Sequence, residues 1–122
     1  MQILGPLESS KCLNLLALKD DKFVIIELGI KSSIIQAVNN QVPIFFFRHF
    51  DKLLNTPLSE LINAYKTITV SKSDILNIEV QSDNLIANKI VVFTEDKERS
   101  FAIPDRGKTN LYKQIVLGWY NQ

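Results

Sequence analysis

The sequence lacks most of the residues on which enzymes and metal proteins depend. Its 122 residues include one histidine, His49, and one cysteine, Cys12, and they contain no nucleophile-elbow, phosphate-loop or metal-ligand motif. A histidine oriented by a carboxylate can act as a general base, and His49 stands between Arg48 and Asp51. We interpret it instead as a surface residue after an apolar run. A nucleophilic cysteine needs an activating neighbour, and for Cys12 the sequence offers only the adjacent Lys11. We therefore interpret Cys12 as a buried or inert thiol. These absences favour a non-catalytic protein without cofactor or metal.

Signals for membranes and secretion are also missing. No apolar run approaches the ~20 residues that cross a bilayer, and residues 1–6 lack the basic start and long apolar core of a signal peptide. One cysteine cannot form an internal disulfide, which is typical of a reducing compartment. We therefore expect a cytoplasmic protein without a transmembrane segment.

Neither sign of charge is in excess, because the sequence has 14 basic and 13 acidic residues. Nucleic-acid binding depends largely on neutralising phosphates, and attachment to anionic lipid depends on clustered basic residues. The balance argues against both. With 46% hydrophobic and 22% charged residues, the composition is typical of a globular protein. The length predicts a single domain over residues 1–122.

The second half of the sequence is dominated by strand patterns. A short strand is expected at 66–70, and in Leu76, Ile78 and Val80 the apolar residues take every second position, which predicts one dry face. Residues 90–94 are β-branched and aromatic, as suits a pleated surface. Alternation resumes at 101–103 after the charged tip 95–98, which predicts an antiparallel hairpin.

Helical spacing begins after Pro104, a residue that cannot donate to a strand ladder. Thr109 or Asn110 is the expected cap, and the helix should span 108–120. One face of it collects the apolar residues Leu111, Tyr112, Ile115, Val116 and Trp119. Such a face must be buried, and the preceding strands are the nearest surface for it to cover.

The first half is less regular. Residues 1–12 form a lead-in with little pattern, whereas 13–18 and 23–28 predict a hairpin that is apolar on both faces and therefore covered on both. Thr56 followed by Pro57 predicts a cap with proline at the first position of a helix over 57–66. Its buried stripe would be Leu58, Leu61, Ile62 and Tyr65.

The densest apolar stretch, 42–47, leaves two alternatives. Pro43 favours the start of an edge strand, but it can also open a helix that runs to Leu54. In a strand with one uncovered face, Phe45, Phe47 and Phe50 would form a docking or dimerisation surface. Cover by the 57–66 helix is the interpretation we favour, and the three phenylalanines remain a candidate interaction surface.

A second candidate site is the segment Arg106-Gly107-Lys108-Thr109. Two cations flank a glycine where a helix begins, and the free N–H groups and partial positive charge of a helix N-terminus attract anions. The segment therefore forms a candidate phosphate or carboxylate site. The favoured interpretation is a polar connector with solvated basic side chains.

The order of elements resembles the pleckstrin-homology-like domains, particularly the small bacterial ones and the related GRAM-type domains. The resemblance covers residues 66–120 and is carried by the run Val70–Val80, the hairpin after it and the terminal helix. It implies an α+β, mainly β barrel of about seven antiparallel strands in two sheets, closed by the helix at 108–120. The helix at 57–66 is an insertion relative to that pattern, and Trp119 lies later in its helix than the family's tryptophan.

The resemblance implies a non-catalytic module that recognises a protein or peptide partner, with self-association as one form of that binding. Lipid-binding members carry basic residues around the first hairpin, but here that loop, residues 19–22, is net neutral. Phosphoinositide and nucleic-acid binding are therefore disfavoured. The alternative is a small ligand carrier or enzyme with an internal pocket that uses His49 or the 106–108 loop.

Overall fold

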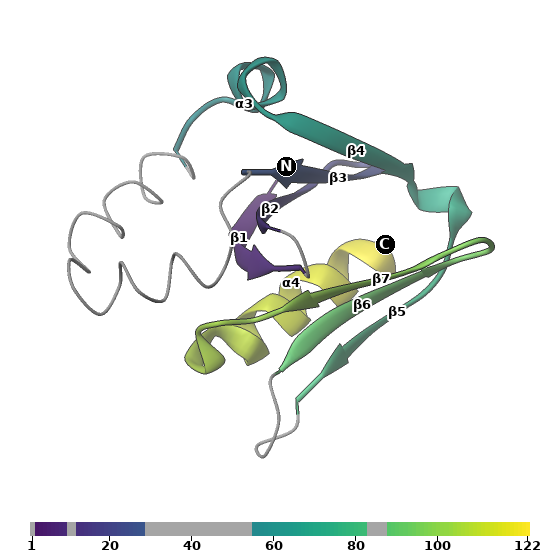
Figure 1. The fold of residues 1–122 in the computed structure, drawn as a ribbon. Helices are drawn as coiled ribbons and strands as arrows, with labels where there is room; N and C mark the ends of the chain where they lie inside the picture. The colour runs from purple at the N-terminus through teal and green to yellow at the C-terminus, as the bar shows by residue number, and fades with distance from the viewer. Residues whose placement is uncertain (1, 10–11, 29–54, 83–87) are drawn as a thin grey trace.

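The computed structural model describes residues 2–9, 12–28, 55–82 and 88–122, and these form a mainly β fold with two α-helices (Figure 1). The helices are α3 (Leu58–Ala64) and α4 (Thr109–Tyr120), and two short 3₁₀ turns occupy 72–74 and 106–108. The strands are β1 (Gln2–Glu8), β2 (Leu13–Leu18), β3 (Lys22–Glu27), β4 (Lys66–Ser71), β5 (Ile75–Gln81), β6 (Lys89–Thr94) and β7 (Glu98–Ala102).

The described strands belong to one antiparallel sheet of seven strands in the order β4-β3-β2-β1-β7-β6-β5, and not to the two sheets expected. The link between the groups is β1, which pairs with β2 along its length and with β7 through Glu8 and Ala102. The expectation of two sheets failed because residues 1–12 were taken as a lead-in, although they supply this linking strand.

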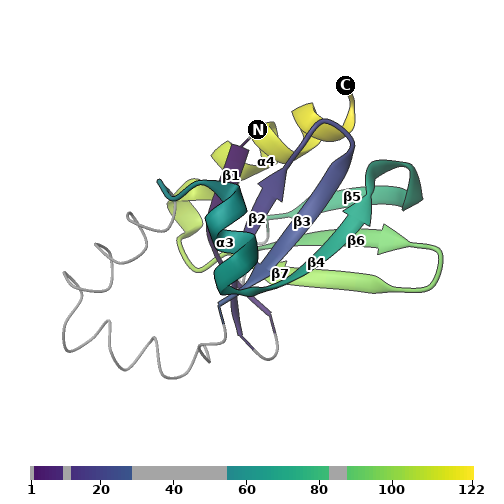
Figure 2. The same cartoon turned by 90° about the horizontal axis from the view of Figure 1, so that it is seen from above.

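The sheet curls so that its two strand groups enclose one core. Figures 1 and 2 show β2–β4 crossing over β5–β7, with α4 beside them. The core joins inner-face residues of both groups: Leu4, Leu7, Leu16, Phe23, Ile25 and Val70 pack with Ile78, Ile90, Val92 and Phe101. Apolar contact between the faces, and not hydrogen bonding, therefore holds the two groups together over most of their area.

The outer face of β2 and β3 carries a second core under α3. Both arms of the predicted 13–28 hairpin are confirmed as strands buried on both faces, since Leu13, Leu15, Val24 and Ile26 pack with Leu58 and Leu61. The predicted 57–66 helix is shorter, at Leu58–Ala64, because Pro57 has an extended backbone and serves as the N-cap. Ile62, expected in the buried stripe, is exposed, and Tyr65 is partly buried.

Helix α4 covers the core as predicted, through Tyr112, Val116 and Trp119. The Trp119 ring lies 5.9 Å from that of Phe23, and its indole N–H donates to the Lys19 carbonyl. Two details differ from expectation. Lys108 is the N-cap residue and makes no side-chain cap, and Leu111 is 52% exposed.

The inward alternation expected in the 76–80 strand is interrupted by a bulge. The register shifts between Ile75 and Asn77, so Ile75 and Ile78 point inward and Leu76 is 65% exposed. A bulge adds one residue without a partner, and this moves the preceding side chains to the opposite face. The expectation that Leu76 is buried was therefore wrong, whereas Ile78 is buried as expected.

Candidate functional site: two grooves along the open side of the sheet

The inner face of β2–β4 changes from apolar to polar along the strands. Cross-strand partners share a face, and Leu16, Ile25 and Ile68 form one such row. The next row consists of Asn14, Glu27 and Lys66. The core therefore ends in a polar row at the side of the sheet where β1 meets β7.

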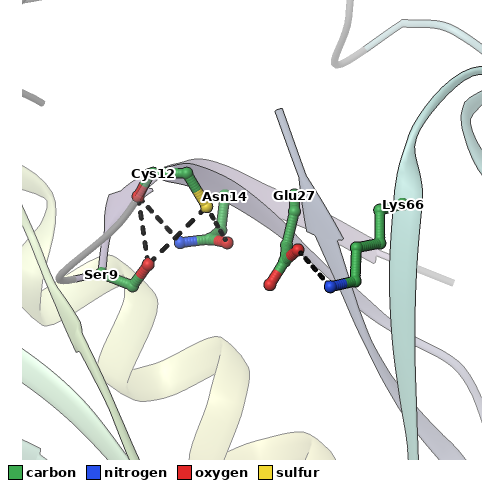
Figure 3. A network of polar contacts seen from close by, with 5 residues as sticks. All are labelled: Ser9, Cys12, Asn14, Glu27 and Lys66. Atoms are coloured by element: carbon green, nitrogen blue, oxygen red, sulfur yellow. Dashed lines mark hydrogen bonds and ion pairs between the residues drawn. The ribbon is translucent and has the colours of Figure 1, made fainter. Parts of the chain in front are cut away.

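This polar row belongs to a network that fixes the turn between β1 and β2 (Figure 3). The Asn14 amide donates to the Cys12 carbonyl at 3.2 Å, and the Cys12 thiol donates to Asn14 Oδ1 at 3.4 Å. The Ser9 hydroxyl donates to the same carbonyl at 3.2 Å. Glu27 pairs with Lys66 at 3.7 Å. Asn14 and Cys12 are buried, as expected for Cys12, whereas 76% of the Lys66 side chain is exposed.

A groove of about 600 Å³ opens over this polar row, and we call it the end groove. Ile25, Ile68 and Phe101 contribute its apolar part. Its polar lining comes from the β1–β2 turn, β2, β3 and β7: Glu8, Ser9, Asn14, Glu27, Glu98, Arg99 and Ser100. The groove lies between strand groups that are paired only at Glu8 and Ala102 among the described residues.

A second groove of about 560 Å³, the side groove, lies between β4 and the β6–β7 hairpin tip. Thr69, Val70, Asp74 and the exposed Leu76 line it, together with residues 94–97. Arg99 lines both grooves. It is partly buried and stands opposite Val92 on the inner face of β7. The grooves therefore share Arg99 as a lining residue, and each takes residues from β4, whose pairing within the described residues is with β3 alone.

The predicted anion segment Arg106–Thr109 forms a 3₁₀ turn followed by the first residue of α4. The Gly107 N–H donates to the Asp105 carboxylate at 3.1 Å. Thr109 is buried, and its hydroxyl accepts from Asn88 Nδ2 at 2.7 Å. The side chains of Asp105 and Asn88 thus already bind two groups of this segment, the Gly107 N–H and the Thr109 hydroxyl. Arg106 and Lys108 are exposed, and anion binding there stays a prediction.

The remaining sequence candidates fall elsewhere. Phe45, Phe47, Phe50 and His49, with the strand-or-helix alternative for 43–54, lie outside the described residues. In the described ranges no group of three or more His, Cys, Asp or Glu residues has the arrangement of a metal site. No helix in the part of the chain that the structure describes is long and apolar enough to cross a membrane.

Comparison of the chain with models of protein families, with curated proteins and with solved structures finds no match. The two grooves are therefore the features of the structure from which a function can be inferred.

Proposed function

We propose that the protein is a non-catalytic binding module that holds an extended segment of a protein or peptide partner. The observation that carries this proposal is that the end and side grooves share Arg99 as a lining residue and that each takes residues from the edge strand β4. A free strand edge presents unpaired N–H and C=O groups to an added strand. An extended segment is the occupant whose shape fits open grooves beside such an edge.

The architecture supports the pleckstrin-homology-like resemblance as part of this proposal. Four strands and then three follow one another as antiparallel neighbours, and a C-terminal helix packs on the core between them. A fold does not specify a function, so the resemblance contributes the expectation of a binding role and nothing about the ligand.

The partner in this proposal is a protein or peptide, and a second copy of this chain is one such partner. Three glutamates line the end groove, and they would repel the phosphates of a phosphoinositide or a nucleic acid. We keep the cytoplasm as the proposed location, because the described part of the chain holds a free, buried Cys12.

A second candidate function is a carrier of a small ligand. The observation that favours it is the size of the end groove, about 600 Å³, which falls within the roughly 300–1,000 Å³ of ligand pockets. Asn14, Ser9 and Ser100 would supply its fixed polar contacts. In this form the ligand occupies the end groove, whose described lining does not include the 106–108 loop.

The proposal is tested by selecting binders from a displayed library of random peptides with the purified protein. Glu27 is partly exposed and lines the end groove from the inner face of β3, so Glu27→Trp should obstruct it. Asn77 is exposed on β5 and lines neither groove, so Asn77→Trp is the matched control. We expect selected peptides to bind the control as well as the original protein, and to lose about tenfold or more in affinity, 1.4 kcal/mol, with Glu27→Trp.

Two results would contradict the proposal. Peptides that bind Glu27→Trp undiminished would place the binding surface elsewhere. A library that yields no binder, together with a small molecule that copurifies with the original protein and is lost from Glu27→Trp, would favour the carrier.

A further inference from the structure

We propose that the edge strand β4 binds β4 of a second copy of this chain, so that two copies join their sheets through an antiparallel pair. The inference rests on the proposed function and names the partner, because each β4 is then the extended segment that the other copy holds. Three observations carry it: the backbone groups that β4 leaves free, the lack of any feature that blocks pairing at this edge, and the self-complementary order of its side chains.

The printed order of hydrogen bonds in the sheet shows which residues of β3 bond to β4. The Leu28 N–H donates to the Leu13 carbonyl at 2.9 Å, and these residues continue the register of β3 with β2. In an antiparallel pair the bonded residues alternate with unbonded ones. The even-numbered residues of β3 therefore bond to β2, and its odd-numbered residues bond to β4.

The same alternation identifies the free groups of β4. The odd-numbered residues of β3 stand opposite Lys66, Ile68 and Val70, which therefore turn their backbone groups toward β3. The Lys72 N–H continues this series, since it donates to the Asp21 carbonyl at 2.8 Å. Neighbouring residues of a strand bond to opposite sides. The N–H groups that point away from the described sheet are thus those of Thr67, Thr69 and Ser71.

Strand β4 lacks the features that usually prevent an edge strand from pairing, namely proline, charged side chains, bulges and cover by another element. Residues 67–71 contain no proline and no charge, and their register with β3 continues without a shift. The other edge strand, β5, has a bulge between Ile75 and Asn77 and carries Glu79, and its Ile75 carbonyl accepts from the Tyr120 hydroxyl of α4. Within the described sheet, β4 is therefore the edge open to another strand.

Open space and uncovered apolar surface lie beside this edge. Thr69 and Val70 line the side groove, and Ile68 lines the end groove. Figure 2 shows β4 at the border of the sheet, with β3 on one side of it. Ile68 packs against the main core but is only partly buried. A strand added at this edge would cover the rest of its side chain.

An antiparallel pair centred on Ile68 makes two β4 edges complementary. Two-fold symmetry places Ile68 opposite Ile68 of the second copy, and Thr67 opposite Thr69 of the second copy. The threonines form the hydrogen-bonded pairs, because their backbone groups point outward, and their hydroxyls meet on the outer face. The two Ile68 side chains meet on the inner face, in the unbonded position where opposite side chains lie closest.

Charge also suits a second copy in this register. The chain has a net charge of +1, so two copies repel one another weakly. Lys66 falls opposite Val70 of the second copy, whereas a pair centred on Thr69 would place Lys66 opposite Lys72 of the second copy. The contact is one strand long, and small interfaces are weak. The dimer should therefore form at high protein concentration and leave β4 free for another segment at low concentration.

The experiment measures association of the whole protein by sedimentation equilibrium over a wide range of concentration. Thr67→Lys with Thr69→Lys places lysine opposite lysine at both bonded pairs, and Thr67→Glu with Thr69→Lys places glutamate opposite lysine at the same pairs. The matched control, Asn77→Lys with Gln81→Lys, adds the same two positive charges at exposed positions of β5. Circular dichroism checks that each variant is folded. If the double-lysine variant does not fold, Thr69→Pro replaces it, because proline is tolerated where an edge N–H faces solvent.

We expect the original protein to dimerise as its concentration rises. The double-lysine variant of β4 should associate about two- to thirtyfold more weakly, because like charges directly opposite each other destabilise a strand pair. Thr69→Pro should also weaken association, since it removes an outward N–H from each copy. The glutamate–lysine variant and the β5 control should dimerise about as well as the original protein.

The inference is overturned if the protein stays monomeric at every concentration, or if the lysines on β4 and those on β5 weaken association equally. A glutamate–lysine variant as weak as the double-lysine variant would overturn the register centred on Ile68. A monomer whose library peptides are lost with Glu27→Trp would leave the proposed function standing without this partner. A β4 dimer whose library peptides bind Glu27→Trp undiminished would leave this partner standing without the role of the end groove.

Discussion

Tyr112 joins the terminal helix to the first strand across the interior. Its buried hydroxyl donates to the Gly5 carbonyl at 3.1 Å. Burial raises the pKa of Tyr112, and the negative charge of Asp105 raises it further. The folded protein therefore keeps this proton above the pH of about 10 at which an unfolded tyrosine loses it.

This difference makes stability depend on pH in the alkaline range. Above about pH 10 the unfolded chain binds fewer protons than the folded one at this site, so the free energy of unfolding falls as pH rises, until the folded pKa is passed. Tyr112→Phe removes that contribution and about 1 kcal/mol of hydrogen bonding at neutral pH. Urea unfolding at a series of pH values should show a shallower alkaline decline for Tyr112→Phe. If the free energy of unfolding of Tyr112→Phe falls with pH as steeply as that of the original protein, the raised pKa of Tyr112 is not the cause of the decline.

At the scale of the element, the last turn of α4 is held by contacts to three separate segments. Lys72 Nζ donates to the Trp119 carbonyl at 2.6 Å and lies 4.9 Å from the centre of its ring. The indole N–H donates to the Lys19 carbonyl, and the Tyr120 hydroxyl donates to the Ile75 carbonyl at 3.1 Å. These contacts tie the helix to the 72–74 turn, to the β2–β3 turn and to the start of β5.

Two substitutions on this helix should differ sharply in effect. Trp119→Ala removes a buried ring and an indole donor, and we expect it to lower the free energy of unfolding by about 3–5 kcal/mol. Leu111→Ala shortens a side chain that is 52% exposed on the same helix, and about 0.5 kcal/mol or less should be lost. Chemical denaturation measures both. Similar losses for the two variants would mean that α4 does not cover the core through Trp119.

Elements with an uninterrupted period were predictable from the sequence, and those with a local irregularity were not. The 90–103 hairpin and the terminal helix were found because their periods run through the whole element, the 13–28 hairpin because its two arms are continuous apolar runs, and the 57–66 helix because of its Thr56-Pro57 start. Strand β1 was missed because Gly5 and Pro6 interrupt it. Gly5 has a φ of +148°, and a Cβ there would lie 2.5 Å from Leu15 Cδ2. The exposure of Leu76 was missed for the same kind of reason. The bulge between Ile75 and Asn77 cannot be recognised in the alternating apolar residues of the sequence.

At the scale of the whole molecule, the grooves had no signal in the sequence. Glu8, Glu27 and Glu98 lie far apart in the chain and line one groove only because the sheet brings β1, β3 and β7 around it. Short-range motifs directed attention to Arg106–Thr109 and to the phenylalanines of 45–50. A site assembled from several strands depends on the order of those strands in the sheet. That order could not be predicted from the sequence, because the linking strand β1 was not recognised.

The curled sheet has two edge strands, β4 and β5, and hydrogen exchange distinguishes which of them receives the partner. Within the described residues each pairs on one side, so N–H groups on their outer sides should exchange faster than those of β2 and β6. Both grooves contain β4 residues, namely Ile68, Thr69 and Val70, whereas β5 contributes Leu76 at its start.

A peptide selected from the library should therefore slow exchange in residues 68–70 and leave residues 77–80 unchanged. Exchange monitored by NMR or mass spectrometry with and without peptide provides the comparison, and Glu27→Trp at the same peptide concentration should show weaker protection. Protection confined to β5 or α4 would mean that the segment binds across the opposite edge. In that case the shared position of Arg99 in the two grooves would have no role in binding, and the acidic lining would be a solvated surface.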